Sequence, residues 1–87
     1  MRVTLNVLHK EAIRVLIEKG YKIILDYIDT DGSEIFCKSS TNQSIVVSID
    51  RKESCYIYTI STNTNKISIT AIMNYLAHLR IFIRKEL

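Results

Sequence analysis

The side chains in this sequence that bind transition metals most readily are two histidines, His9 and His78, and two cysteines, Cys37 and Cys55. No two of them have the spacing of a zinc knuckle, in which two residues separate a pair of ligands. His9 borders the apolar face of a predicted helix, as a partly buried structural histidine does, and His78 falls on the exposed face of another. The cysteines suit small buried positions, and the lack of an export signal favours free thiols. We therefore predict no bound metal and no disulfide.

Patterns typical of catalysis are also missing from the sequence. Serine and threonine are frequent, but no Gly-x-Ser-x-Gly elbow and no glycine-rich setting for an oxyanion hole accompanies them. Asp26, Asp29 and Asp31 surround a predicted turn, where aspartate is favoured for its backbone hydrogen bonds. The glycine-rich loops that bind nucleotides do not occur. We predict that the protein is not an enzyme and that it uses no cofactor.

Length and composition indicate one small domain that spans residues 1–87. A hydrophobic content of 47% and a charged content of 24% are typical of a globular protein and exclude a disordered chain. The net charge of +3 permits contact with nucleic acid without requiring it. No apolar run is long enough to cross a membrane, and polar residues interrupt the N-terminal segment. We therefore expect a cytoplasmic protein of a bacterial or archaeal cell, without a membrane partner.

Residues 5–19 predict a first helix, because apolar side chains recur at helical spacing on one face and polar side chains cover the other. Thr4 or Asn6 can cap its start, and Gly20 suits the left-handed residue that ends a helix. Val7 is expected to face water. The predicted apolar face comprises Leu5, Leu8, Ala12, Val15 and Leu16, widened by Ile13 and Ile17.

From Tyr21 to Ser61 the hydrophobic period changes to two, which predicts short strands. Four strands are expected, over residues 21–28, 33–38, 45–49 and 55–61. In the first, Tyr21, Ile23, Leu25 and Tyr27 are predicted to share one face. Asp31-Gly32 favours a tight type I′ turn between the first two strands. Because all connections are short, neighbouring strands should pair antiparallel as a meander.

Residues 69–85 predict a second helix, with Ser68 as its N-cap and with Ile67 and Ile72 in a hydrophobic staple. Its expected core stripe is Ile72, Met73, Leu76, Leu79 and Ile83, flanked by Tyr75 and Phe82. The predicted fold is α+β, in the order α-β-β-β-β-α, with both helices packed on one face of a four-stranded antiparallel meander. The other face keeps apolar side chains (Ile24, Ile28 and Phe36, or those of opposite parity), which suggests a partner.

The exposed side of the last helix is the first candidate contact surface, and the open sheet face around Phe36 is the second. Ile81 falls opposite the core stripe, next to arginine and tyrosine, which are enriched at interfaces. The candidate residues are Tyr75, His78, Arg80, Ile81, Arg84, Lys85 and Phe36. In one alternative, Arg80, Arg84 and Lys85 only complement the helix dipole. In the other, they contact phosphate or an acidic partner. Tyr56 and Tyr58 could also form a base-stacking platform with Phe36, although packing within the sheet is the more common role of such side chains.

The first half of the chain resembles the small mRNA-interferase toxins of the hic type. The likeness rests on residues 10–13, 18–21, 32–36 and 45–47. It implies an α-β-β-β-α fold like that of double-stranded-RNA-binding domains. In that family a catalytic histidine follows the Gly-Ser pair, whereas this chain has Glu34 there, and the strand expected at 55–61 is additional. The resemblance therefore implies an RNA-binding module or a degenerate toxin without the family's general base.

These observations favour a small non-catalytic binding protein that acts by protein–protein contact, with another protein or a second copy as its partner. Short chains without motifs include inhibitors of host macromolecular complexes from phages and mobile elements, such as anti-CRISPR proteins. The abundance of Ile, Lys, Asn and Tyr is typical of the AT-rich genomes in which such elements occur. One alternative is RNA binding through the basic last helix. Another is a homodimer that buries the open sheet face on itself.

Overall fold

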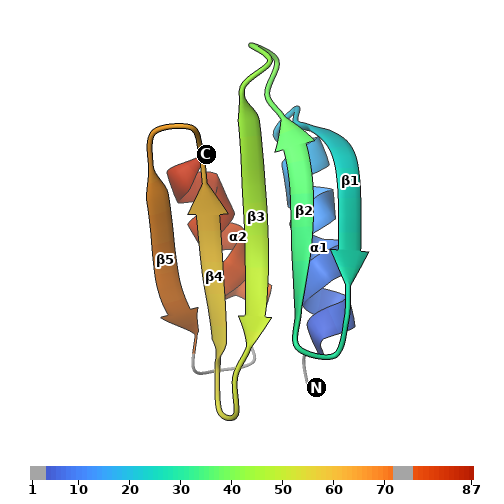
Figure 1. The fold of residues 1–87 in the computed structure, drawn as a ribbon, viewed down its shortest axis with the longest axis vertical. Coiled ribbons are helices and arrows are strands. Elements are labelled where there is room, and N and C mark those ends of the chain that lie inside the picture. Colours follow the sequence, from blue (N-terminus) through green and yellow to red (C-terminus); the bar gives the residue numbers. More distant parts are fainter. Residues whose placement is uncertain (1–3, 72–75) are drawn as a thin grey trace.

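The computed structural model describes residues 4–71 and 76–87 and has two helices and five strands in these ranges. The elements are α1 (Leu5–Glu18), β1 (Lys22–Ile28), β2 (Gly32–Lys38), β3 (Ser44–Arg51), β4 (Tyr56–Ser61), β5 (Lys66–Ala71) and α2 (Leu76–Glu86). The strands form one antiparallel sheet in the order β1-β2-β3-β4-β5. Both helices lie behind the sheet in Figure 1, so the face without helices is turned to the viewer. The predicted α+β class is confirmed, but the sheet has five strands instead of four.

The fifth strand is the main correction to the sequence prediction. Residues 69–71, predicted as the first turn of the last helix, instead belong to β5, which pairs antiparallel with β4. Polar and apolar side chains alternate along β5, and isoleucine and threonine suit the pleated backbone of a strand. The preceding turn is closed by a hydrogen bond from the Thr62 N–H to the Asn65 carbonyl, at 2.8 Å. Ser68 is therefore a strand residue and not an N-cap, while Ile72, Met73 and Tyr75 lie outside the described residues.

The first helix follows its predicted pattern. The Thr4 hydroxyl accepts a hydrogen bond from the Val7 N–H at 3.3 Å, as an N-cap does, and Gly20 adopts a φ of +91° beyond the last turn. The buried face consists of Leu5, Leu8, His9, Ala12, Val15 and Leu16. Two expectations were wrong, because the side chain of Ile17 is 58% exposed and Val7 packs partly buried against the core.

A β-bulge in β1 changes which side chains face the helices. Ile23 is paired with Cys37 and Leu25 with Phe36, so Ile24 is an extra residue in the ladder. The prediction that residues 21–27 alternate regularly was therefore wrong. The bulge leaves Ile23 on the helix-covered face and places Leu25 and Tyr27 on the open face, on the same side as Phe36.

The turn between β1 and β2 also differs from the predicted type I′ turn. Gly32 begins β2, and among the described residues only Gly20 and Asn42 have a positive φ. Instead the Asp29 carboxylate accepts hydrogen bonds from the backbone N–H groups of Asp31 and Gly32, at 2.8 and 2.9 Å. This is the local side-chain hydrogen bonding for which aspartate is favoured in turns.

The hydrophobic core fills the space between the sheet and the two helices. Tyr58 and Ile60 of β4 point into it, and the Tyr58 ring stacks on Phe82 of α2 with a centroid distance of 6.4 Å. Leu79 and Ile83 are fully buried as predicted, whereas Leu76 is partly buried. The suggested base-stacking platform of Tyr56, Tyr58 and Phe36 does not form, because Tyr58 faces the helices whereas Phe36 lies on the open face.

The two cysteines are free thiols, with Cys37 buried on β2 and Cys55 half-buried before β4. Burial raises the pKa of the Cys37 thiol to about 11, so this side chain stays a neutral, apolar group at physiological pH. Neither helix, over its described residues, is long and apolar enough to cross a membrane.

Candidate protein-binding surfaces

A groove lies between α2 and the edge strand β5. Its volume is about 320 Å³, and it is lined by Ile69, His78, Ile81, Phe82, Lys85 and Glu86. The groove exists because α2 packs on α1 and β4, which leaves the helix-facing side of β5 partly open. Ile69 is paired with the core residue Tyr58 and shares its face, yet the Ile69 side chain is 37% exposed. We call these six residues the β5–α2 groove.

Three of the residues predicted as contact residues come together in this groove. His78, Ile81 and Lys85 lie on the same side of α2, and the Ile81 side chain is 61% exposed. Ile69 and Phe82 complete the apolar lining but were not predicted as site residues. The alternation of residues 66–71 was the signal that could have placed Ile69 on this face.

The predicted contact residues Arg80 and Arg84 lie elsewhere, on the flank of α2 that faces α1. Arg84 Nη2 donates to Glu18 Oε1 at 2.9 Å, and Arg80 Nε lies 3.3 Å from Glu11 Oε2. Arg14 donates to both carboxylates, at 2.6 Å to Glu11 and 2.8 Å to Glu18. These five side chains form a charge network that joins the two helices. Tyr75, another predicted contact residue, lies outside the described residues.

We expect Glu11→Gln to lower the free energy of unfolding by about 0.5–1 kcal/mol near neutral pH and to have a smaller effect at about pH 3. The Arg14 hydrogen bonds, together with the charges of the arginines nearby, lower the pKa of the Glu11 carboxyl against an opposing contribution from burial. A carboxyl whose pKa is lowered by folding adds stability above its unfolded pKa. That stability is lost as the pH falls through the folded value.

Denaturant unfolding of both proteins at the two pH values measures this difference. Glu53→Gln is the control, since Glu53 is exposed on the β3–β4 turn and lies outside the charge network. An equal loss of stability at both pH values would contradict the assigned role of the Glu11 charge.

The open sheet face carries a second apolar surface. Leu25 and Tyr27 are 56% and 48% exposed, and Phe36 and Val46 beside them are half-buried. The rings of Tyr27 and Phe36 stack with a centroid distance of 6.2 Å and an interplanar angle of 29°. The Tyr27 hydroxyl donates to the carboxylate of Glu34. Phe36, predicted as a contact residue, is thus on the opposite side of the sheet from Ile81.

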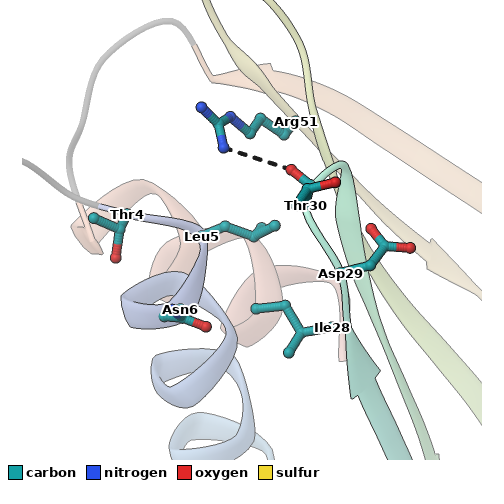
Figure 2. Close-up of a pocket in the computed structure, with 7 residues that line it drawn as sticks. All are labelled: Thr4, Leu5, Asn6, Ile28, Asp29, Thr30 and Arg51. Carbon is teal, nitrogen blue, oxygen red and sulfur yellow. Dashed lines mark hydrogen bonds between the residues drawn. The ribbon is translucent and has the colours of Figure 1, made fainter.

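Another hollow, of about 400 Å³, lies where α1 begins beside the β1–β2 turn (Figure 2). Arg51 reaches across it and donates to the Thr30 carbonyl at 3.5 Å, while Asp29 is engaged by the turn. Figure 2 shows these polar groups near Leu5 and Ile28, which are apolar. Arginine and aspartate on one rim offset each other's charge, so the hollow offers no concentrated charge to a ligand.

His9 and Asp26 form a histidine–carboxylate pair, with 2.8 Å between His9 Nε2 and Asp26 Oδ2. Such pairs orient a catalytic histidine when the other ring nitrogen is open to substrate. Here Nδ1 is buried without a hydrogen-bond partner among the described groups. The pair therefore connects α1 to β1 and does not resemble a proton-transfer site. No three His, Cys, Asp or Glu side chains gather as metal ligands in residues 4–71 and 76–87.

Comparison with known proteins identifies no relative of this chain. No family model matches it, and no curated protein and no solved structure matches it either. Function is therefore inferred from the β5–α2 groove and the open sheet face, the two exposed apolar surfaces described above.

Proposed function

We propose that this chain is a small non-catalytic binding protein, and that it contacts a partner protein through the β5–α2 groove. The observation that carries this proposal is the combination of a free strand edge with an apolar groove beside it. β5 ends the described sheet, since it pairs with β4 on one side only. An extended segment of a partner can add to such an edge through backbone hydrogen bonds, and its alternate side chains can enter the groove.

The two edges of the sheet differ in their protection against strand addition. β1 carries a bulge at Ile24 and a charged side chain, Asp26, on its helix-facing side, and both features discourage pairing. β5 pairs regularly with β4 over all six residues, and its only charged side chain is Lys66 at its first position. Of the two sheet edges, β5 is therefore the one that is less protected against the addition of a partner strand.

The composition of the groove indicates what kind of segment fits it. Ile69, Ile81 and Phe82 provide apolar contacts, and Lys85 provides a positive charge on the helix rim. A partner strand with alternating apolar side chains and a carboxylate near Lys85 complements this surface. We propose inhibition of a host macromolecular complex, of the phage or mobile-element type, as the role that this contact serves.

RNA binding through the last helix receives less support from the arrangement of charges. Of the basic residues expected to contact phosphate, Arg80 and Arg84 face the carboxylates of Glu11 and Glu18 on α1. Lys85 remains at the groove, where it stands next to Glu86. Phosphate contacts need several cations gathered on one accessible surface, which this helix does not offer over its described residues.

We expect the double variant Ile81→Glu, Lys85→Glu to lose partner binding while its circular dichroism and melting curve stay nearly unchanged. Both side chains are exposed, so their replacement places repulsive charge in the groove without disturbing the core. The measurement is recovery of the tagged chain from its native cells and identification of the bound protein at increasing salt. Binding should persist at salt concentrations that remove phosphate contacts.

The matched control is Ile17→Glu, because Ile17 is 58% exposed on α1, close to the 61% of Ile81. This control should retain the partner. Equal recovery of the partner by all three proteins would contradict the assignment of the groove. Recovery of RNA that is lost steeply with salt would contradict protein contact as the function.

A further inference from the structure

We infer that the open sheet face is the contact surface for a second copy of this chain. This inference goes beyond the proposed function, because the open face and the β5–α2 groove lie on opposite sides of the sheet. It rests on the positions of apolar and charged side chains that the strand register brings into rows.

The register aligns four rows of side chains across the open face. The first row is Lys22, Lys38 and Ser44; the second is Leu25, Phe36, Val46, Ser61 and Lys66; the third is Tyr27, Glu34, Ser48, Thr59 and Ser68; the fourth is Gly32, Asp50, Ile57 and Thr70. The lysines therefore stand toward the end of the sheet that is uppermost in Figure 1, and the carboxylates stand toward the opposite end.

Apart from Ile57 in the fourth row, the large apolar side chains occupy the middle of the face and are displaced to the β1 side. Leu25, Tyr27, Phe36 and Val46 lie next to one another on β1, β2 and β3. The β4 and β5 side of the same rows carries mainly serine and threonine, with Thr59 and Ser68 hydrogen-bonded at 2.9 Å. A partner surface for this face must therefore be apolar over β1–β3 and must reverse the charges at the two ends.

A second copy meets both requirements when a twofold axis runs parallel to the sheet and across the strands. This axis places each strand over its own counterpart and lays the second row of one copy over the third row of the other. Leu25 then faces Tyr27 of the second copy. Phe36 lies over Glu34, next to that Tyr27.

The same axis reverses the strand direction, so the first row of one copy lies over the fourth row of the other. Lys22 and Lys38 then approach Asp50 of the second copy at both ends of the interface. Face-to-face packing of two sheets of this kind is common, with about 10 Å between them.

A nucleic acid is a poorer occupant of the same face, although stacked aromatic rings and lysines are present. Glu34 contacts the Tyr27 hydroxyl next to the ring pair, and Asp50 lies farther along the same face. These carboxylates repel phosphate at the place where bases would stack. In the symmetric dimer, by contrast, Asp50 lies near Lys22 and Lys38 of the second copy.

The test is the molecular mass in solution, measured by sedimentation over a range of protein concentrations. It compares the unchanged protein with variants in which the lysine and the aspartate at opposite ends of the open face are exchanged. The unchanged protein should be a dimer, and Leu25→Glu should be monomeric. Lys38→Glu and Asp50→Lys should each raise the dimer dissociation constant about fivefold to tenfold, because each change occurs twice across the axis. The double variant Lys38→Glu, Asp50→Lys should restore the dimer, since the exchanged charges meet again.

Two controls make the outcome specific to this face. Ile17→Glu on α1 also replaces an exposed aliphatic side chain with Glu, at a site of similar exposure to Leu25, and should stay dimeric, as should Ile81→Glu in the groove. Circular dichroism and melting must show that each variant is folded. A monomeric unchanged protein, a folded dimeric Leu25→Glu, or no recovery of the dimer in the double variant would overturn the inference.

Two other results would overturn it by assigning the surfaces differently. Loss of the dimer in Ile81→Glu would assign self-association to the groove. Binding of a labelled single-stranded RNA that Tyr27→Ala abolishes would assign the open face to nucleic acid.

Discussion

Leu79→Ala is expected to lower the free energy of unfolding by about 3 kcal/mol. The Leu79 side chain is fully buried on α2, together with Phe82 and Ile83. Its truncation removes buried methyl groups and leaves a cavity that the sheet and α1 cannot fully close. α2 spans 11 described residues, Leu76–Glu86, and a helix of this length is marginal in isolation, so its folding depends on these contacts. Denaturant unfolding measures the change.

Ile81→Ala is the matched control for this prediction, because it shortens another apolar side chain of the same helix. The Ile81 side chain is 61% exposed, so the expected loss is below about 0.5 kcal/mol. Similar midpoints for the two variants would show that α2 does not bury the face described here.

Gly32→Ala is expected to cost about 2 kcal/mol, the second largest effect. A Cβ atom at this position would lie 2.9 Å from the carbonyl oxygen of Ile49 on β3. The clash is with backbone, so no side chain can rotate away, and β2 and β3 must separate locally. The cause is therefore the close approach of two strands and not the conformation of the glycine.

Gly20 provides the contrasting case within the same chain. Its φ is +91°, but a Cβ there would have no neighbour within 4 Å, so the cost of Gly20→Ala is backbone strain of about 1 kcal/mol. Asparagine tolerates this conformation, and Gly20→Asn should be milder than Gly20→Ala. Gly32→Asn should be at least as harmful as Gly32→Ala. Melting temperatures of the four variants distinguish the steric clash at position 32 from the backbone strain at position 20. A Gly32→Asn variant that melts close to the unchanged protein would contradict the clash.

Much of the fold could be predicted from the periodicity of the sequence, because α1, β2 and β3 each bury one regular face, and β4 buries Tyr58 and Ile60 of its predicted face together with Thr59. The local sequence pattern of residues 66–71 does not distinguish a strand from the start of a helix. Ser68 resembles an N-cap, and Ile67 resembles the first residue of a staple, yet both also fit the alternation of a strand. Pairing with β4 decides between them, and this pairing is a tertiary contact. The bulge at Ile24 could not be predicted for a similar reason. The sequence pattern keeps its period of two through Ile24, whereas the pairing of β1 with β2 skips this residue.

Of the candidate site, only the residues on one face of α2 could be predicted from the sequence. The helical period places His78, Ile81 and Lys85 together, and the structure does the same. It cannot show that Arg80 and Arg84 turn toward α1, because their carboxylate partners lie more than 60 positions away in sequence. Ile69 could not be included while its segment was assigned to a helix.

Photo-crosslinking from position 81 tests most directly whether the β5–α2 groove binds a protein. A benzophenone amino acid at this position, introduced into the chain in its native cells, is activated by light, and its adducts are identified by mass spectrometry. The same substitution at position 17, on the exposed side of α1, is the control. One protein partner is expected to be crosslinked at position 81 and not at position 17. Adducts with RNA, or identical adducts at both positions, would contradict it.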